Sequence, residues 1–322
     1  MNTILSNPRF AETYQRLATV SLNPRRHTAA NAHAHSEAVS ARATALAEAN
    51  GCTPADVALL RDLGRVHDLG KVTGSARPEK SLDVLRDCGV DDARLLALVK
   101  WHDTNLPWYL SAQRGQPPSD KAWRRLAAEL DVRLLAMFMV ADRVDAPPGW
   151  RRNAPLVWFL DEARRRGLVS DLVLDLPDHA SEISSGAALV EAGRVLVIRV
   201  RVAGFELPKG GIEWDELPED AAVRELREET GLMSSVELGR KLGHIDYTVG
   251  DGADRHVKRV RYFRCQPSEP VVLGPVPDRT RELRWVRADE VAALPLVNED
   301  LRALLRAVFV TGDVLVPETA HT

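Results

Sequence analysis

The spacing of apolar residues changes once along this chain of 322 residues, and that change limits the folds open to it. Residues 1 to about 170 repeat apolar side chains at helical spacing, which predicts an almost wholly helical part. After a polar connection at 176–185, short Val-rich segments alternate or run apolar, which predicts strands. We therefore expect a multidomain chain, with an all-α domain over 1–175 and an α+β domain over 180–318.

Local signals place individual elements inside these two parts. Thr53 is a predicted helix N-cap, and Pro54 follows it at the first helical position. Gly51 should close the preceding helix, and Pro147 and Pro148 should close a later one. The second part is expected to contain strands and helices at the following positions: strands within 186–192, 194–202, 256–266 and 281–288, and helices within 218–230 and 297–309.

Composition restricts the protein's surroundings and partners. Hydrophobic residues make up 45% of the chain and charged residues 28%, with no apolar run near the roughly 20 residues that a membrane span needs. The three cysteines, Cys52, Cys88 and Cys265, form no disulfide framework or metal-binding pair in the sequence. We expect a cytoplasmic protein that binds no membrane. The net charge of −3 argues against a duplex DNA partner, but a small phosphorylated nucleotide or an RNA end remains compatible.

One segment of the second part, GGIEWDELPEDAAVRELREETGL at 210–232, is crowded with carboxylates. Pro218 is suited to the first turn of a helix and Gly231 to its end. At 100° per residue, Glu225, Glu228 and Glu229 project from one face of that helix. Converging carboxylates repel unless a cation lies among them, and oxygen ligands suit Mg²⁺ or Mn²⁺.

The same segment resembles the Nudix box: G, five residues, E, seven residues, R, E, aliphatic, any, E, E, any, G, aliphatic. The matching residues are Gly210, Glu216, Arg224, Glu225, Leu226, Glu228, Glu229, Gly231 and Leu232. The resemblance implies a Nudix hydrolase domain, with a mixed sheet between helices, that cleaves a diphosphate linkage. It also implies metal ligands and catalytic residues at these positions: Glu225, Glu228, Glu229 and the carbonyl of Gly210 as ligands of Mg²⁺ or Mn²⁺, with Glu228 and Arg224 catalytic.

Segments around the box resemble the dinucleoside polyphosphate hydrolase branch of that family. They include LPKGG at 207–211, GHIDYTV at 243–249, KRVRYF at 258–263 and RELRWV at 281–286. The resemblance implies that Tyr247 stacks on an adenine, that Lys209 and Lys258 contact phosphates, and that Glu282 is a catalytic base or a ligand. RNA 5′-pyrophosphohydrolases and diphosphoinositol phosphate hydrolases share much of this pattern, so both substrates stay open.

A second group of metal-ligating residue types lies in the helical part. His67 and Asp68 end a predicted helix in RVHDLGK, whereas His35 and Asp142 lie on other predicted helices. Helical bundles build metal sites from imidazole and carboxylate groups on separate helices. The alternative is that these are structural polar residues, since a single histidine on a helix is more often structural than a ligand.

The order H, HD, D and the form VHDLGK resemble the HD-domain phosphohydrolases. The resemblance implies that His35, His67, Asp68 and Asp142 bind one divalent transition metal, Mn²⁺, Fe²⁺, Ni²⁺ or Co²⁺, and that Asp68 is also catalytic. Lys71 is expected near the substrate phosphate. His102 is expected to be a substrate contact or an additional ligand, and because no other histidine lies between His67 and Asp142, one metal is favoured over two.

Together these features predict a bifunctional metal-dependent phosphohydrolase. The Nudix domain would hydrolyse a diphosphate linkage in a nucleoside polyphosphate, and the HD domain a phosphomonoester or phosphodiester. The alternative is a Nudix hydrolase of RNA 5′ ends or diphosphoinositol phosphates that is joined to a non-catalytic, nucleotide-sensing HD domain.

Overall fold

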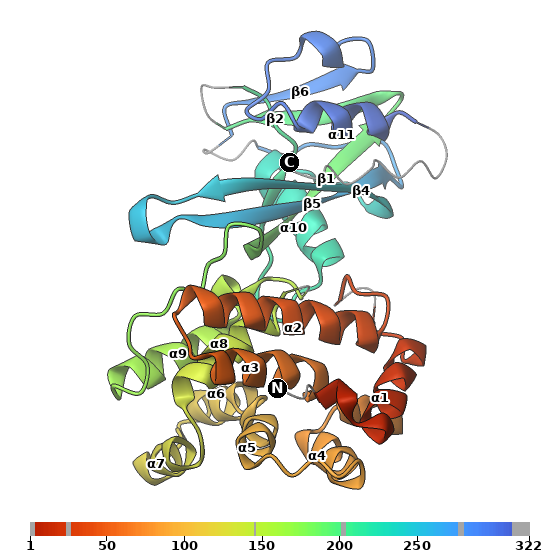
Figure 1. Ribbon diagram of the computed structural model, residues 1–322. Helices are drawn as coiled ribbons and strands as arrows, with labels where there is room; N and C mark the ends of the chain where they lie inside the picture. Colours follow the sequence, from red (N-terminus) through yellow and green to blue (C-terminus); the bar gives the residue numbers. More distant parts are fainter. Residues whose placement is uncertain (1–3, 24–26, 145, 201–203, 276–279, 311–322) are drawn as a thin grey trace. The chain divides into compact units, whose positions relative to one another are not determined.

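The computed structural model describes residues 4–23, 27–144, 146–200, 204–275 and 280–310 (Figure 1). The chain divides into two compact units, Met1–Ser181 (unit 1) and Glu182–Thr322 (unit 2). Residues 311–318 of the predicted second domain lie outside the described residues. None of the described helices is long and apolar enough to cross a membrane.

Unit 1 is a bundle of helices, which confirms the prediction of a helical first part. Its α-helices are α1 Pro8–Gln15, α2 Ala32–Ala49, α3 Pro54–Val66, α4 Pro78–Asp87, α5 Ala93–Trp101, α6 Asn105–Gln113, α7 Asp120–Glu129, α8 Val132–Ala141 and α9 Ala154–Arg165. Short 3₁₀ helices lie at η1 Ile4–Ser6, η2 Arg16–Thr19, η3 Leu69–Thr73 and η4 Trp150–Arg152. One hydrophobic core, which includes Leu60, Leu63 and Phe138, joins the helices.

Side-chain caps explain where several of these helices begin. Thr53 accepts a hydrogen bond from the backbone N–H of Asp56 and Pro54 is the first residue of α3, as predicted. The side chain of Asn31 does the same for α2 by accepting from the N–H of Ala34. These caps fix the starting points of the two helices that later present His35 and His67.

Helices α2 and α3 approach each other closely at Gly64. A β-carbon on Gly64 would lie 2.4 Å from the α-carbon of Ser40 on α2. The Ser40 hydroxyl donates to the carbonyl of Arg61 at 2.8 Å, which adds a polar contact at the same crossing. The absence of a side chain at Gly64 therefore sets the separation of the two helices.

Unit 2 contains a six-stranded sheet and two main helices, as the α+β prediction requires. The elements are β1 Ala180–Glu191, β2 Arg194–Arg199, β3 Lys209–Gly211, α10 Pro218–Thr230, β4 Val236–Val249, η5 Gly252–Asp254, β5 His256–Pro267, β6 Glu282–Arg287, η6 Val291–Ala293 and α11 Leu301–Val308. The strand order is β4-β5-β1-β2-β6, with β3 paired to β1. The predicted strands and helices are all present, whereas β3 and β4 were not predicted.

The two faces of the sheet are covered by different helices. Ala188, Val190 and Val197 pack in one core with Leu301, Leu304 and Leu305 of α11. The alternating residues Ala187, Leu189 and Leu196 pack in a second core with Ala222 and Leu226 of α10. Because successive side chains of a strand point to opposite faces, this alternation places the sheet between the helices, and the predicted sheet between helices is confirmed.

We predict that Gly64→Ala destabilises unit 1 by about 1–3 kcal/mol, because the new methyl group forces α2 and α3 apart. Chemical denaturation followed by circular dichroism will measure the change. A denaturation midpoint equal to that of the parent would contradict the close approach of the two helices at this residue.

Candidate functional sites

The acidic segment forms the turn from β3 into α10. Pro218 begins α10, Glu219 and Asp220 lie in its first turn, and Gly231 ends it in the left-handed conformation with φ 70°. Glu225 and Glu229 are buried, with 6% and 7% exposure. Two carboxylates of the box therefore lie inside the protein next to the β3 loop, while half of the Glu228 side chain is exposed.

The guanidinium of Arg224 holds the acidic groups together. It donates two hydrogen bonds of 2.8 Å to the carboxylate of Glu216 and one of 2.7 Å to Oε1 of Glu225. It also donates to Oε2 of Glu228 at 3.2 Å and to the carbonyl of Gly211 at 2.7 Å. Glu216, followed by Glu225, raises the pKa of Arg224, so the group stays charged.

Glycine and a backbone amide place the buried glutamates against the loop. A β-carbon on Gly210 would lie 2.1–2.2 Å from the atoms of the Glu225 carboxylate, so that carboxylate rests directly on the Gly210 backbone. The N–H of Lys209 donates to Oε2 of Glu229 at 2.8 Å. The result is a set of hard oxygen donors beside a backbone loop, which fits Mg²⁺ or Mn²⁺.

The flanking residues differ in how near they come to the box. Burial alone would lower the pKa of Lys209, but Glu206, followed by Tyr247 and Glu229, raises it. Tyr247 lies opposite Lys258 in the β4–β5 pair. The ammonium of Lys258 is held by Glu182 at 2.8 Å, and its role as a phosphate contact stays a prediction.

Glu282 on β6 forms an ion pair with Arg199 on β2, and its role as base or ligand also stays a prediction. Two residues that the sequence patterns did not indicate are closer to the box. Thr280 donates its hydroxyl hydrogen to the carbonyl of Glu229 at 2.7 Å. Glu206 contacts the ammonium of Lys209. Neither lies in the box itself, and no local signal pointed to them.

In unit 1, three helices end at the second group of predicted site residues. His67 is the C-cap of α3, His102 the C-cap of α5 and Asp142 the C-cap of α8, while His35 lies within α2. The C-terminal end of a helix has a partial negative charge from its unpaired carbonyl groups. Three such ends beside two carboxylates favour a cation at this position.

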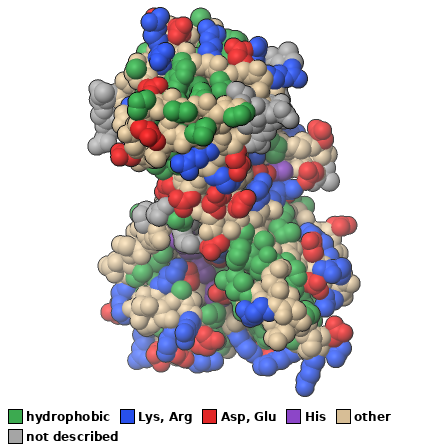
Figure 2. All heavy atoms as spheres, turned by 180° about the vertical axis from the view of Figure 1, so that it is seen from behind, with side chains coloured by type: hydrophobic (Ala, Val, Ile, Leu, Met, Phe, Trp, Pro, Cys, Tyr) green, Lys and Arg blue, Asp and Glu red, His purple; other side chains and the backbone are tan. Residues whose placement is uncertain are grey.

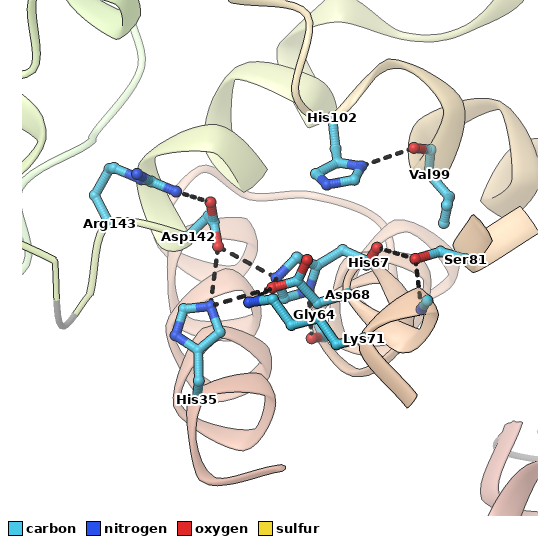
Figure 3. A network of polar contacts seen from close by, with 11 residues as sticks. His35, Gly64, His67, Asp68, Lys71, Ser81, Val99, His102, Asp142 and Arg143 are labelled. Carbon is cyan, nitrogen blue, oxygen red and sulfur yellow. Dashed lines mark hydrogen bonds and ion pairs between the residues drawn. The ribbon is translucent and has the colours of Figure 1, made fainter. Parts of the chain in front are cut away.

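The polar atoms of these residues converge (Figure 3). Oδ1 of Asp142 lies 3.2 Å from Nε2 of His35 and 3.3 Å from Nε2 of His67. Oδ2 of Asp68 lies 3.3 Å from Nε2 of His67 and 4.0 Å from Nε2 of His35. Ligand atoms of His35, His67 and Asp68 all lie within 4.8 Å of one another, which is close enough to share one metal ion.

The ring of His67 fits a metal ligand. Its Nδ1 lies 2.9 Å from the carbonyl of Gly64, and a proton on Nδ1 leaves Nε2 with a lone pair. Nε2 is buried and faces a carboxylate oxygen of Asp68 and one of Asp142, each at 3.3 Å. Burial alone would lower the pKa of His67, but Asp68 and Asp142 raise it to about 10. The surroundings therefore favour positive charge at Nε2, from a proton or a metal ion.

Lys71 and His102 lie beside this cluster. The ammonium of Lys71 is 2.5 Å from Oδ2 of Asp68. The ring of His102 is 5.5 Å from that of His67, and its Nδ1 lies 2.7 Å from the carbonyl of Val99, so a proton there leaves Nε2 with a lone pair as in His67. The geometry leaves both predicted roles of His102, substrate contact and additional ligand, open. In Figure 2, histidine side chains are visible in a hollow of unit 1.

Sequence reasoning missed two further residues of this site. Arg143 forms an ion pair with Asp142, next to it in the sequence, and the alternation of charges in VADRVDA was the available signal. The hydroxyl of Ser81 donates to the carbonyl of His67 at 2.7 Å and accepts from the N–H of Gly70 at 2.9 Å. These contacts fix the turn that presents Asp68 and Lys71.

The NUDIX domain family profile matches residues 182–308. An isopentenyl-diphosphate Delta-isomerase of Roseobacter denitrificans is 36% identical over 81 residues, which are 24% of this chain and 44% of that protein. A MutT-like protein of Streptomyces ambofaciens is 34% identical over 117 residues, 36% of this chain and 69% of that protein. An RNA pyrophosphohydrolase of Xanthomonas campestris pv. campestris is 46% identical over 63 residues, 19% of this chain and 31% of that protein.

The chain belongs to the Nudix family through unit 2. The predicted Nudix assignment is thereby confirmed for the fold and the family. The chain spans less than half the length of the isomerase and of the RNA pyrophosphohydrolase that it matches. The names of these relatives cover more than one reaction, so the similarity does not define the chemistry of unit 2.

We predict that Gly210→Ala weakens Mg²⁺ binding to unit 2 by about tenfold or more, because the methyl group displaces the carboxylate of Glu225. Since only the end of a flexible side chain has to move, the melting temperature should stay close to that of the parent. Isothermal titration with Mg²⁺ and thermal denaturation will measure both quantities. Unchanged Mg²⁺ affinity would show that Glu225 is not a ligand in the position described.

Proposed function

We propose that this protein is a metal-dependent phosphohydrolase with one site in each unit, and that unit 2 hydrolyses a diphosphate linkage in a nucleoside polyphosphate. The observation that supports the activity of unit 2 most directly is the set of box carboxylates gathered around Arg224 and the Gly210 backbone. Family members without catalysis would have little need of the complete set.

In unit 2, Glu225, Glu228, Glu229 and the Gly210 carbonyl would hold Mg²⁺ or Mn²⁺. The cation, when bound, would neutralise phosphate charge and lower the pKa of a bound water. Arg224 keeps three carboxylates in position, so their arrangement does not have to be formed at each turnover. Lys209 would contact a phosphate oxygen, and Tyr247 would stack on a base, while Glu282 would serve as base or ligand.

The hairpin of β4 and β5 favours a small nucleotide over an RNA chain. Arg259 donates two hydrogen bonds, of 2.8 and 2.7 Å, to the carboxylate of Asp246, and Lys258 is held by Glu182. RNA binding draws on positive charge that can reach the phosphates. Because both cations are paired with carboxylates, this hairpin offers little net positive charge to a long phosphate chain, whereas a single phosphate contact needs only one free N–H donor. The similarity to RNA pyrophosphohydrolases keeps RNA 5′ ends as the alternative substrate.

For unit 1 we propose an HD-type phosphohydrolase site, with a single divalent transition metal held by His35, His67, Asp68 and Asp142. Nitrogen and carboxylate donors together suit Mn²⁺, Fe²⁺, Ni²⁺ or Co²⁺. Asp68 would be both ligand and catalytic residue, with Lys71 near the phosphate of a phosphomonoester or phosphodiester. The support is the buried Nε2 of His67, which faces two carboxylates at 3.3 Å.

We predict that Glu228→Gln lowers Mg²⁺-dependent cleavage of diadenosine tetraphosphate by about 100-fold or more, because a proposed metal ligand that is also a proposed catalytic residue is lost. The half-exposed position of Glu228 should leave the melting temperature unchanged. Chromatography of the products will give the rate. Glu213→Gln removes an exposed carboxylate from the same segment and should retain parental activity.

Undiminished cleavage by Glu228→Gln would remove the proposed role of the box. A parent protein that cleaves 5′-triphosphorylated RNA but no dinucleoside polyphosphate would replace the first substrate class with the alternative one.

We predict that His67→Ala lowers the Mn²⁺ affinity of unit 1 by more than about 100-fold, since the ring supplies a nitrogen that would bind the metal directly. Metal analysis after dialysis against Mn²⁺ will measure the metal content of the parent and the variant. His33→Ala is the matched control, because His33 lies on α2 with its ring against Tyr14 and outside the cluster.

Equal metal content in the parent and His67→Ala would contradict the unit 1 site. Normal metal binding by a parent that hydrolyses no phosphoester in a panel of nucleotides would favour the sensing alternative for unit 1 over turnover.

A further inference from the structure

We propose that Glu206 is a positioning residue of the unit 2 site, and that it holds the ammonium group of Lys209 where a substrate phosphate binds. This inference rests on the proposed hydrolysis of a diphosphate linkage by unit 2. It adds a carboxylate that lies before the box and outside its metal ligands.

Glu206 and Lys209 form a largely buried ion pair. Oε2 of Glu206 lies 2.7 Å from Nζ of Lys209, and the two side chains are 13% and 20% exposed. The backbone of Glu206 is fixed on both sides, since its N–H donates to the carbonyl of Ile198 at 2.8 Å and its carbonyl accepts from the N–H of Ile198 at 2.9 Å. The carboxylate therefore extends from a rigid position beside β2.

Lys209 connects this ion pair to the metal-binding part of the site. The N–H of Lys209 donates to Oε2 of Glu229. The β-carbon of Lys209 would lie 2.9 Å from a β-carbon built on Gly186. A β-carbon on Gly186 would also lie 2.7 Å from the ring of Tyr262, so Lys209 and Tyr262 both pack closely against Gly186. One residue thus contacts a proposed metal ligand through its backbone and Glu206 through its side chain.

An ion pair at this depth is not explained by stability alone. Removing two charges from water costs about as much free energy as their attraction returns, and an apolar pair of similar size is often at least as stable. The pair also restricts a lysine stem that would otherwise have many rotamers. A function at this position accounts for both: the pair fixes the ammonium group of the residue whose backbone N–H binds Glu229.

The chemistry of lysine leaves room for a phosphate. Its ammonium has three N–H donors, and a single contact to Glu206 engages one of them. A phosphate oxygen next to the cation could accept from another without breaking the ion pair. The structure therefore assigns Glu206 an effect that depends on Lys209, whereas a carboxylate that binds Mg²⁺ itself would act without Lys209.

A double-mutant cycle tests this dependence. We predict that Glu206→Gln weakens binding of pyrophosphate in the presence of Mg²⁺ by about 3- to 30-fold, the range for a residue coupled to its neighbour. Lys209→Ala should weaken binding more, and Glu206→Gln added to Lys209→Ala should have no further effect. Isothermal titration gives the four affinities, and KM for diadenosine tetraphosphate should rise in Glu206→Gln with a smaller change in kcat.

Several outcomes would overturn the inference. The first two are a Glu206→Gln variant that binds pyrophosphate as tightly as the parent, and a double variant in which the two losses of pyrophosphate affinity add. The other two are a parent protein that binds no pyrophosphate, and a Glu206→Gln variant that binds Mg²⁺ more weakly than the parent. Glu213→Gln is the control for loss of a carboxylate. If the cycle is non-additive but the parent cleaves no substrate, the proposed function fails while the role of Glu206 in phosphate binding stands.

Discussion

The hydrogen bonds of Arg224 are the interaction on which the unit 2 site depends. Eight carboxylates lie between Glu213 and Glu229, and their repulsion would favour an open, disordered loop. One guanidinium joins Glu216 from the loop to Glu225 and Glu228 from the helix, and it also binds the Gly211 carbonyl. Arginine is suited to this task because its five donors lie in a fixed plane. Loop and helix are therefore held together before any cation binds.

Unit 1 meets a similar electrostatic constraint with different groups. The carboxylates of Asp68 and Asp142, 11% and 15% exposed, are in contact with Lys71 and Arg143 respectively, and both face imidazole nitrogens. Burial alone would raise the pKa of Asp68, but His67 and Lys71 lower it. Both carboxylates are consequently kept as anions inside the bundle, which is the state that metal binding requires.

The sequence was most informative where one residue type has one local role. Pro218 and Gly231 marked the ends of α10, and Thr53 marked the start of α3, because these residues act on their own backbone. Strand β4 was missed because its side chains are mostly exposed or half-buried and glycines interrupt its pattern. The contact of His35 with Asp142 spans 107 positions and was reachable only through a family resemblance, and the Glu206–Lys209 pair depends on backbone geometry that no motif records.

Both sites also depend on a residue without a side chain. Gly64 allows α2 to approach α3, and its carbonyl lies 2.9 Å from Nδ1 of His67, so one glycine affects both the spacing of the helices and the orientation of a proposed ligand. Gly210 has the equivalent place in unit 2, where the Glu225 carboxylate occupies the space of a missing β-carbon. The geometry of both proposed metal sites is therefore set by the backbone as much as by the side chains. It follows that a methyl group on a neighbouring glycine can displace a proposed ligand even though the ligand residue itself is unchanged.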